Sequence, residues 1–188
     1  MPFSATPLPG VIIIEPVVFP DGRGFFFESY NQRLFRENQI LNEFVQDNQS
    51  LSVYSVIRGL HYQREPHAQS KLVRVLQGRI LDVVVDLRAG SPGFGKSFSI
   101  ELSAENKKQI FIPRGLAHGF SVLSAIAEIS YKCDQFYNKQ SEAGIRYNDS
   151  TLNIDWQIPF AKALVSDKDA KLPEFNPSVS DFMYKADA

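Results

Sequence analysis

The sequence contains very little cysteine. Cys133 is the only cysteine among 188 residues, which excludes an intramolecular disulfide and a zinc site built from cysteines. A chain of this length can bury a sizeable core without such cross-links. A single thiol also fits a reducing compartment, so we expect a soluble, cytoplasmic protein.

The sequence also lacks a strong net charge and a long hydrophobic run. The formal net charge is -1, so no overall field attracts nucleic acid or an anionic membrane, and local cations must meet any anionic ligand. The apolar run Val11–Ile14 is short, follows Pro9 and Gly10, and has no cationic stretch before it. We therefore expect no signal peptide, no membrane span, and no nucleic-acid or membrane partner.

Long amphipathic helices are absent as well: none begins before about residue 178, and no repeat or internal domain boundary is visible. Short apolar runs separated by Gly, Pro and Asn predict strands at residues 11–15, 25–30, 44–46, 51–62, 71–77, 79–87, 97–102, 109–112, 119–124 and 126–133. Asn31 is expected to cap a short helix at residues 32–38. This pattern favours an all-β sandwich or barrel formed by one domain, residues 1–188. The tail at residues 172–188 carries no motif and is expected to add a short helix at residues 180–185.

Positive and titratable side chains gather at one point in this strand-rich sequence. Arg58, His61 and Lys71 lie in a stretch flanked on both sides by apolar strand residues. A core has no use for such groups, because a buried charge is costly unless it is paired. Any one of the three could lie on an outer face, but together they indicate a site that binds an anion and moves a proton.

A second cluster follows later in the chain. Pro113 and Gly115 predict a tight turn that places His118 at the start of the next strand. Alone, such a histidine is more often a hydrogen-bonded structural residue than a catalyst. A barrel built from two Greek keys brings this turn and the His61 strand to the same mouth, which favours a shared site.

These clusters resemble known patterns. Pro113-x-Gly115-x-x-His118 resembles the second cupin motif. Over about residues 11–172 the chain is similar to the dTDP-4-dehydrorhamnose 3,5-epimerase family, through Asp21-x-Arg23-Gly24-Phe25-Phe26-x-Glu28, Gln46-Asp47-Asn48, Arg58-Gly59-Leu60-His61-Tyr62-Gln63, Ala117-His118-Gly119-Phe120 and Ser166-x-Lys168-Asp169. The resemblance implies an all-β, double-stranded β-helix jelly roll of the cupin type with a few short peripheral helices. It also implies a homodimer and neither a metal nor an organic cofactor.

The resemblance implies an enzyme that inverts C3 and C5 of dTDP-4-dehydro-6-deoxy-glucose, on the route to dTDP-rhamnose for cell-surface polysaccharide. Both carbons flank the C4 carbonyl, so their protons are acidic, and inversion needs a base on one ring face and an acid on the other. The implied roles are His61 as base, Asp169 as its carboxylate partner, Tyr131 as acid and Lys71 as the cation that stabilises the C4 enolate. From the residues alone, Asp169 would be a solvated loop residue and Tyr131 a core aromatic.

The resemblance also implies a set of residues that hold the nucleotide sugar: Arg23, Phe27, Glu28, Gln46, Asn48, Arg58, Lys71, His118, Tyr137, Glu142 and Lys168. Guanidinium groups suit a diphosphate, and Tyr137 matches an aromatic that stacks on thymine. Arg23 and Glu28 are expected to complete the site of the dimer partner. Arg58 and His61 differ in strand parity, so both face one cavity only if a bulge near Gly59 shifts the alternation.

Three alternatives stay open. An epimerase that inverts only one centre would share this fold and these motifs. A metal-dependent cupin oxygenase would read His-x-His at its first motif, whereas Gln63 holds the second position here and Lys71 adds a positive charge. A non-catalytic sugar-binding jelly roll would have no use for His61, Tyr131 and Asp169. The chain departs from the family pattern at Tyr62, where Phe is usual, and at Phe136, where a second Tyr is common.

Overall fold

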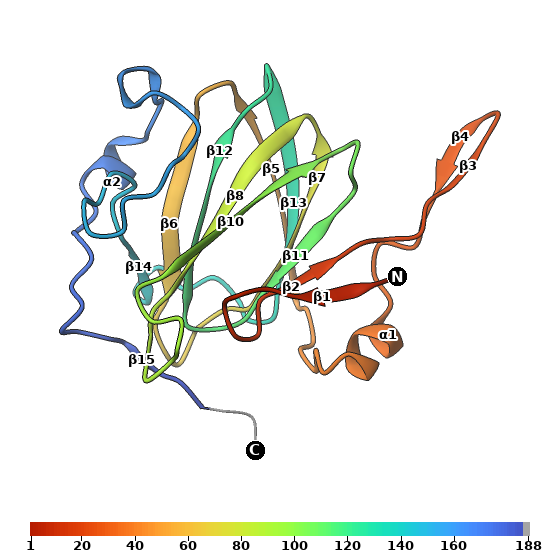
Figure 1. The fold of residues 1–188 in the computed structure, drawn as a ribbon. Helices are drawn as coiled ribbons and strands as arrows, with labels where there is room; N and C mark the ends of the chain where they lie inside the picture. Colours follow the sequence, from red (N-terminus) through yellow and green to blue (C-terminus); the bar gives the residue numbers. More distant parts are fainter. Residues whose placement is uncertain (186–188) are drawn as a thin grey trace.

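The computed structural model describes residues 1–185 and shows two antiparallel sheets that face each other (Figure 1). One sheet has six strands in the order β1-β2-β11-β7-β13-β5, and the other has five in the order β10-β8-β12-β6-β14. The six strands are β1 (Phe3–Ala5), β2 (Ile12–Ile14), β11 (Gln109–Ile112), β7 (Lys71–Gln77), β13 (Ile126–Cys133) and β5 (Gln46–Val53). The five are β10 (Ser97–Ser103), β8 (Arg79–Asp86), β12 (Leu116–Val122), β6 (Ile57–Gln63) and β14 (Glu142–Gly144). The predicted all-β jelly roll is confirmed.

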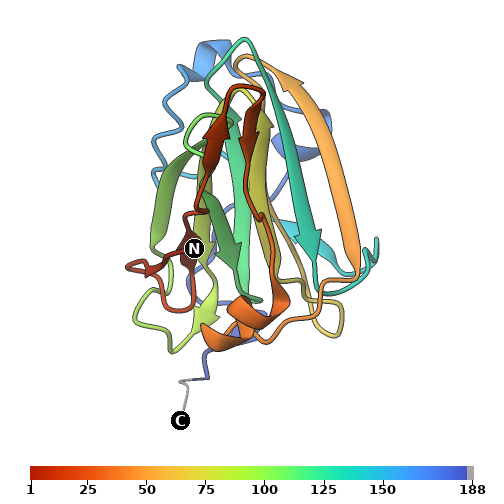
Figure 2. The same ribbon diagram turned by 90° about the vertical axis from the view of Figure 1, so that its right-hand side faces the viewer.

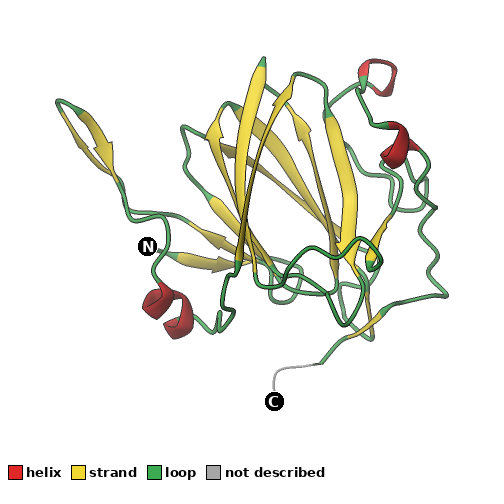
Figure 3. Cartoon of the chain, turned by 180° about the vertical axis from the view of Figure 1, so that it is seen from behind, coloured by secondary structure: helices red, strands yellow, loops and turns green. Residues whose placement is uncertain are grey.

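Smaller elements surround the two sheets. They are the hairpin of β3 (Phe19–Asp21) and β4 (Gly24–Phe26), the parallel pair of β9 (Arg88–Ala89) and β15 (Phe182–Met183), the helices α1 (Gln32–Glu37) and α2 (Asp167–Ala170), and a 3-10 turn at Phe160–Lys162. The helices α1 and α2 lie on opposite sides of the sheets (Figure 3). The short peripheral helices are therefore also as predicted.

Both faces of β8, an inner strand of the five-stranded sheet, are buried. Ile80 and Val84 of β8 belong to the cluster of apolar side chains between the sheets. Val83 and Val85 point the other way, into a second cluster that includes Trp156 of the C-terminal segment. This double burial explains why β8 is almost continuously apolar instead of alternating.

The predicted strand at residues 51–62 is wrong, because the chain changes sheets within it. Residues 46–53 form β5, which pairs with β13 along its length at the edge of the six-stranded sheet (Figure 2). Residues 57–63 form β6 of the other sheet. Ser55 lies between them at φ 68°, and its N–H donates to Val122 O. A serine in this left-handed region is uncommon, and the apolar residues around it concealed the turn.

The helix predicted at residues 32–38 is confirmed as α1. Asn31 Oδ1 accepts hydrogen bonds from Arg33 N and Leu34 N at 3.1 and 3.3 Å, which satisfies two free donors of the first turn. Phe35 is fully buried in a small apolar cluster beside the six-stranded sheet. The cap at Asn31 and the apolar Phe35 lie in or next to the helix itself, which is why the sequence predicted this helix.

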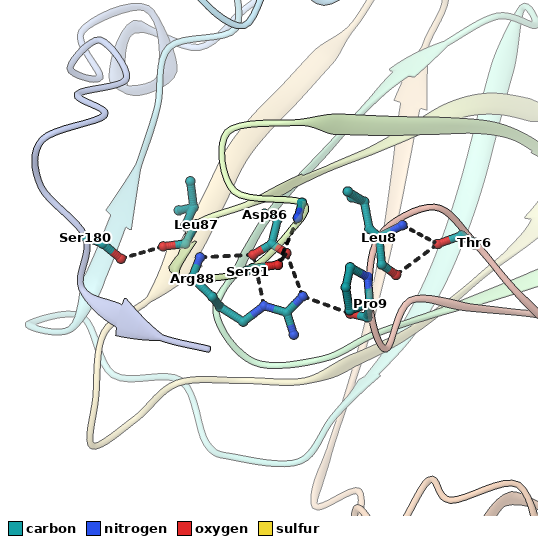
Figure 4. Close-up of polar contacts among 9 residues, drawn as sticks. Thr6, Leu8, Pro9, Asp86, Leu87, Arg88, Ser91 and Ser180 are labelled. Carbon is teal, nitrogen blue, oxygen red and sulfur yellow. Dashed lines mark hydrogen bonds and ion pairs between the residues drawn. The ribbon is translucent and has the colours of Figure 1, made fainter. Parts of the chain in front are cut away.

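The helix predicted at residues 180–185 is wrong, because the tail adds the strand β15 beside β9. Ser180 Oγ donates to Leu87 O at 2.5 Å (Figure 4). Phe182 is buried in the apolar cluster that covers the five-stranded sheet. The tail thus takes its conformation from partners far away in the sequence. Residues 186–188 lie outside the described part.

A buried ion pair closes the same end of the fold (Figure 4). Arg88 donates from Nε and Nη2 to the two carboxylate oxygens of Asp86, at 2.9 and 2.7 Å. Arg88 Nη2 also donates to Pro9 O at 2.8 Å, and Ser91 Oγ donates to Asp86 Oδ2 at 2.6 Å. This bidentate pair ties the N-terminal loop to the end of β8.

Tyr62 attaches the tail to β6. Its hydroxyl donates to Asp181 Oδ2 at 2.9 Å, and Arg64 Nε donates to the same oxygen at 3.0 Å. The ring of Tyr62 packs edge-on against Phe182, with centroids 5.7 Å apart. Burial and the hydrogen bond to Asp181 raise the pKa of Tyr62 to about 12. The departure from the family's Phe therefore has a structural use here.

We predict that Tyr62→Phe lowers the free energy of unfolding by about 1 kcal/mol at pH 8, because it removes one hydrogen bond to a carboxylate. In a chain of this size that corresponds to about 2–4 °C in Tm. The folded-state pKa of about 12 exceeds the ordinary value of 10.0, so this stabilisation is complete below pH 10 and disappears as the pH rises toward 12. Calorimetry across this range measures it.

Tyr54→Phe is the matched control, because Tyr54 is exposed and its hydroxyl makes no hydrogen bond within residues 1–185. Equal Tm values for wild type and Tyr62→Phe at pH 8 would show that the hydroxyl does not hold the tail.

Candidate active site

A bulge in β6 brings Arg58 and His61 to the same side, as the sequence required. His61 lies opposite His118 of β12. Arg58 lies opposite Phe120, so three steps along β6 match two steps along β12. Gly59 allows this with φ 121°, and a Cβ at Gly59 would lie 2.6 Å from the backbone of β12.

A buried carboxylate holds the imidazole of His61. Asp169 Oδ1 lies 2.7 Å from His61 Nε2, and Asp169 Oδ2 accepts from Gly59 N at 3.1 Å. Asp169 is placed by α2, whose first turn is capped by Ser166. Burial acts to raise the pKa of Asp169, but the contacts with His61 and Gly59 outweigh it, and the pKa lies below its ordinary value. Asp169 contacts only the Nε2 side of the ring, and His61 Nδ1 makes no hydrogen bond within residues 1–185.

His61 lines a cavity of about 160 Å³ whose walls come from both sheets. The cavity brings together the predicted residues His61, Lys71, Tyr131, Gln46, Asn48, Tyr137 and Glu142. It is also lined by Tyr62, Gln63 and Gln69, which the sequence analysis did not assign to the site. The signal for the first two was their place in the His61 motif. His61 belongs to the five-stranded sheet, whereas Lys71 and Tyr131 belong to the six-stranded sheet.

Burial controls the charge of the two groups on the six-stranded side. Lys71 Nζ lies 5.9 Å from the centroid of the Tyr131 ring. Burial lowers the pKa of Lys71, and nearby acidic groups offset this only in part. Burial also raises the pKa of Tyr131, so the phenol keeps its proton at neutral pH. The phenol of Tyr131 can therefore donate a proton, and the amine of Lys71 beside it can stabilise a negative charge that develops on a ligand.

A short polar chain forms another wall of the cavity. Tyr137 hydroxyl donates to Glu142 Oε2 at 3.0 Å, and Lys168 Nζ donates to Glu142 Oε1. Burial acts to raise the pKa of Glu142, but these two donors outweigh it and the pKa is lowered. The predicted residues Tyr137, Glu142 and Lys168 are therefore in direct contact.

A groove of about 590 Å³ adjoins the cavity at His61. Arg58, Lys168 and Asp169 line it together with His61. Arg58 Nε donates to Ser52 Oγ at 3.0 Å, which anchors the guanidinium group to β5. Two cations at the mouth of a cavity suit an anionic ligand such as a diphosphate.

His118 is buried against a carboxylate that the sequence analysis missed. His118 Nε2 lies 2.8 Å from Asp82 Oδ2, and both side chains are inaccessible or nearly so. Asp82 Oδ1 is buried without a hydrogen-bond partner among residues 1–185. The sequence signal was an aspartate inside the apolar strand β8, because a buried carboxylate is costly unless it has a hydrogen-bonding or charged partner.

The remaining predicted residues, Arg23, Phe27 and Glu28, do not reach this cavity. Arg23 lies in the hairpin of β3 and β4, which projects away from the two sheets (Figure 1). The Arg23 side chain is 92% exposed and pairs only with Asp21 of the same hairpin. Phe27 and Glu28 follow β4 directly. These residues can act on a catalytic cavity only if it belongs to another chain.

Within residues 1–185, no group of three or more His, Cys, Asp and Glu side chains is arranged to hold a metal ion. No helix in the same residues is long and apolar enough to cross a membrane.

Comparison with known proteins agrees with this geometry. Residues 5–177 match the family described as dTDP-4-dehydrorhamnose 3,5-epimerase. The enzyme of that name from Shigella flexneri is 53% identical over 171 residues, which cover 90% of this chain and 93% of the relative.

Solved structures are similar over nearly the whole chain. The dTDP-4-dehydrorhamnose 3,5-epimerase from Elizabethkingia anophelis is 56% identical, with a TM-score of 0.90, and the match covers 93% of this chain and 96% of that one. The dTDP-6-deoxy-D-glucose-3,5-epimerase from Legionella pneumophila, solved with dTDP-4-keto-L-rhamnose, is 43% identical, with a TM-score of 0.92 and coverage of 98% and 99%. The chain therefore belongs to the dTDP-4-dehydrorhamnose 3,5-epimerase family, and its activity is that of an isomerase.

Proposed function

We propose that this enzyme inverts C3 and C5 of dTDP-4-dehydro-6-deoxy-glucose with His61 as base and Tyr131 as acid, giving dTDP-4-dehydro-L-rhamnose. The observation that carries this assignment is that His61 and Tyr131 line one cavity from different sheets, while Asp169 lies 2.7 Å behind His61. The sugar nucleotide bound by the Legionella pneumophila relative supports the choice of substrate.

Each inversion is a balanced proton exchange. His61 removes the proton from C3 or C5, and the electron pair of the broken C–H bond moves onto the C4 oxygen as an enolate. Lys71 stabilises this negative charge. Tyr131 then donates its phenolic proton to the same carbon from the opposite ring face, and solvent restores both groups. The reaction has no net oxidation, so it requires no redox cofactor.

One base can serve both centres. C3 and C5 flank the same carbonyl, so a small shift of the ring brings either proton to His61. Both enolates place their charge on the same C4 oxygen, so Lys71 serves both. Asp169 keeps the His61 ring in one orientation and stabilises it when it is protonated, as in other His–carboxylate pairs.

The other predicted residues are assigned to the nucleotide and its phosphates. Arg58, His118, Gln46, Asn48, Tyr137, Glu142 and Lys168 lie in or next to the cavity and the groove, on the same chain as His61. Arg23, Phe27 and Glu28 are assigned to the cavity of a second copy, in a homodimer, because the hairpin that carries Arg23 projects away from its own chain. The proposed setting is the cytoplasm, on the route to dTDP-rhamnose for cell-surface polysaccharide.

The metal-dependent oxygenase is the weaker reading. Both ends of the Gln63 amide are hydrogen-bonded to backbone groups, at 2.6 and 2.7 Å, so its oxygen is already engaged with Asn138 N and serves the loop instead of replacing the second histidine of a metal site. The sugar-binding reading leaves the His61 and Asp169 pair unexplained. The single-centre epimerase differs only in which carbon exchanges its proton, so solvent labelling separates it.

Removing the proposed base or its partner should strongly reduce turnover and leave nucleotide binding intact. We expect His61→Ala and Asp169→Asn to lower kcat by about 10² to 10⁴, the usual contribution of a general base. Calorimetric titration with dTDP should give a Kd within a few-fold of wild type. Asp167→Asn is the matched control, because Asp167 is exposed on the same short helix. A His61→Ala enzyme with near-normal kcat would contradict the assignment of His61 as the base.

Tyr131→Phe should separate proton removal from inversion. His61 can still remove a proton and return one from solvent to its own face, so NMR in deuterated water should show deuterium entering the substrate without epimerisation. The wild type should label C3 and C5 alike. Tyr54→Phe should behave as wild type. If the wild type labels one carbon only after long incubation, the single-centre alternative replaces the double epimerisation.

Subunit mixing tests the shared site. Arg23→Ala and His61→Ala chains should each form inactive homodimers. A heterodimer combines one intact His61 with the partner's intact Arg23 and so regains one working site. Random reassociation of equal amounts should restore about a quarter of the wild-type activity, since half of the dimers are mixed and each has one site of two. Confirmed heterodimers without activity would place both residues in the same chain's site.

A further inference from the structure

The loop between β13 and β14, residues 134–141, is held mainly by hydrogen bonds. At its start, Asp134 accepts from Ser70 N at 2.6 Å and from Asn42 Nδ2 at 2.7 Å. The loop has no regular secondary structure, yet it carries Tyr137 to the wall of the catalytic cavity. Phe136 and Tyr137 are 62% and 54% exposed, so burial of their rings cannot fix the loop. The order of the loop around Tyr137 therefore depends on hydrogen bonds, several of them to its backbone.

Gln63 supplies bonds on both sides of Tyr137. Gln63 Oε1 accepts from Asn138 N at 2.6 Å, and Gln63 Nε2 donates to Phe136 O at 3.2 Å. The second Nε2 proton is donated to His67 O at 2.7 Å, in the turn after β6. Gln63 is 5% exposed, so these bonds are shielded from water and the amide has no donor left for another partner.

Two further glutamines extend the same pattern. Gln46 Oε1 accepts from Tyr137 N at 2.9 Å, and Gln69 Nε2 donates to Gln135 O at 2.7 Å. Gln63 is the only one of the three that bonds to the backbone at two positions of the loop within residues 1–185, and it does so from the strand that carries His61. It therefore links the position of the proposed base to the position of the wall that Tyr137 and Glu142 form.

We propose that Gln63 is a positioning residue that fixes loop 134–141 and thereby holds Tyr137 and Glu142 ready for the nucleotide sugar. The inference rests on the proposed function, in which Tyr137 and Glu142 contact the substrate. Glu142 follows the loop as the first residue of β14, and it is paired with Gln63 in the register of β14 and β6, so the residue that bonds to the loop also adjoins Glu142. A wall ordered before binding saves the entropy that substrate would otherwise lose by ordering it.

The test compares Gln63→Leu with Gln49→Leu. Gln49 is exposed on β5 and donates only to Glu128 Oε1, so its replacement is a matched control outside the site. In Gln63→Leu, we expect amide hydrogen exchange in residues 135–141 to become about tenfold faster. The Kd for dTDP and the KM for the sugar nucleotide should rise about tenfold, with kcat within about threefold of wild type.

If Gln63 only stabilised the fold, Gln63→Leu would lower Tm without faster exchange in residues 135–141 and without a rise in Kd and KM. A folded Gln63→Leu enzyme with wild-type exchange in residues 135–141 and an unchanged Kd for dTDP overturns the inference. If Gln63→Leu does not fold, hydrogen exchange of the wild-type enzyme without ligand provides the test. The inference requires the amide of Asn138 to be protected from exchange. Exchange of this amide at the unprotected rate overturns the inference. A wild type that fails to label substrate would instead count against the proposed function, because loop exchange is measured without substrate.

Discussion

The close approach of Gly59 to β12 is the constraint on which the candidate catalytic site depends. With a Cβ only 2.6 Å from the neighbouring backbone, no larger residue fits there without moving one of the strands. The bulge at this glycine changes the alternation of β6, so that Arg58 and His61 line the same groove. The N–H of Gly59 also donates to Asp169 Oδ2 at 3.1 Å. A single residue thus sets the direction of the proposed base and helps to hold the carboxylate behind it.

The C-terminal segment supplies that carboxylate as a consequence of how the core is built. The five-stranded sheet needs cover on its outer face, and Trp156 and its neighbours provide it. Ser121 Oγ of β12 donates to Trp156 O at 2.6 Å, so the cover is also fixed by a buried hydrogen bond. Further along the segment, α2 brings Asp169 to β6. Packing that stabilises the sheet therefore also completes the proposed catalytic pair.

Local signals made much of this fold predictable from the sequence. Apolar runs with turn residues between them identified most strands, and Asn31 identified α1, because each signal lies next to the element it predicts. The errors at the tail and at Asp82 arose where a distant partner decides the outcome, whereas the turn at Ser55 was hidden by the apolar residues around it. Phe182 forms a strand because it packs in a remote cluster, and Asp82 is buried because His118 binds it. From the residues alone Asp169 was a solvated loop residue, and only the family resemblance placed it beside His61.

Two facing sheets suit the stereochemistry of an epimerase better than one sheet could. Side chains on a single sheet would approach a sugar ring from one side, whereas inversion needs groups on both ring faces. In this fold the inward side chains of the two sheets meet across a narrow space, with His61 on one wall and Tyr131 on the other. The same burial keeps the phenol of Tyr131 protonated and lowers the pKa of Lys71. In the proposed mechanism, the negative charge that develops on the substrate beside Lys71 favours the protonated form of Lys71, so the enolate strengthens the interaction that stabilises it.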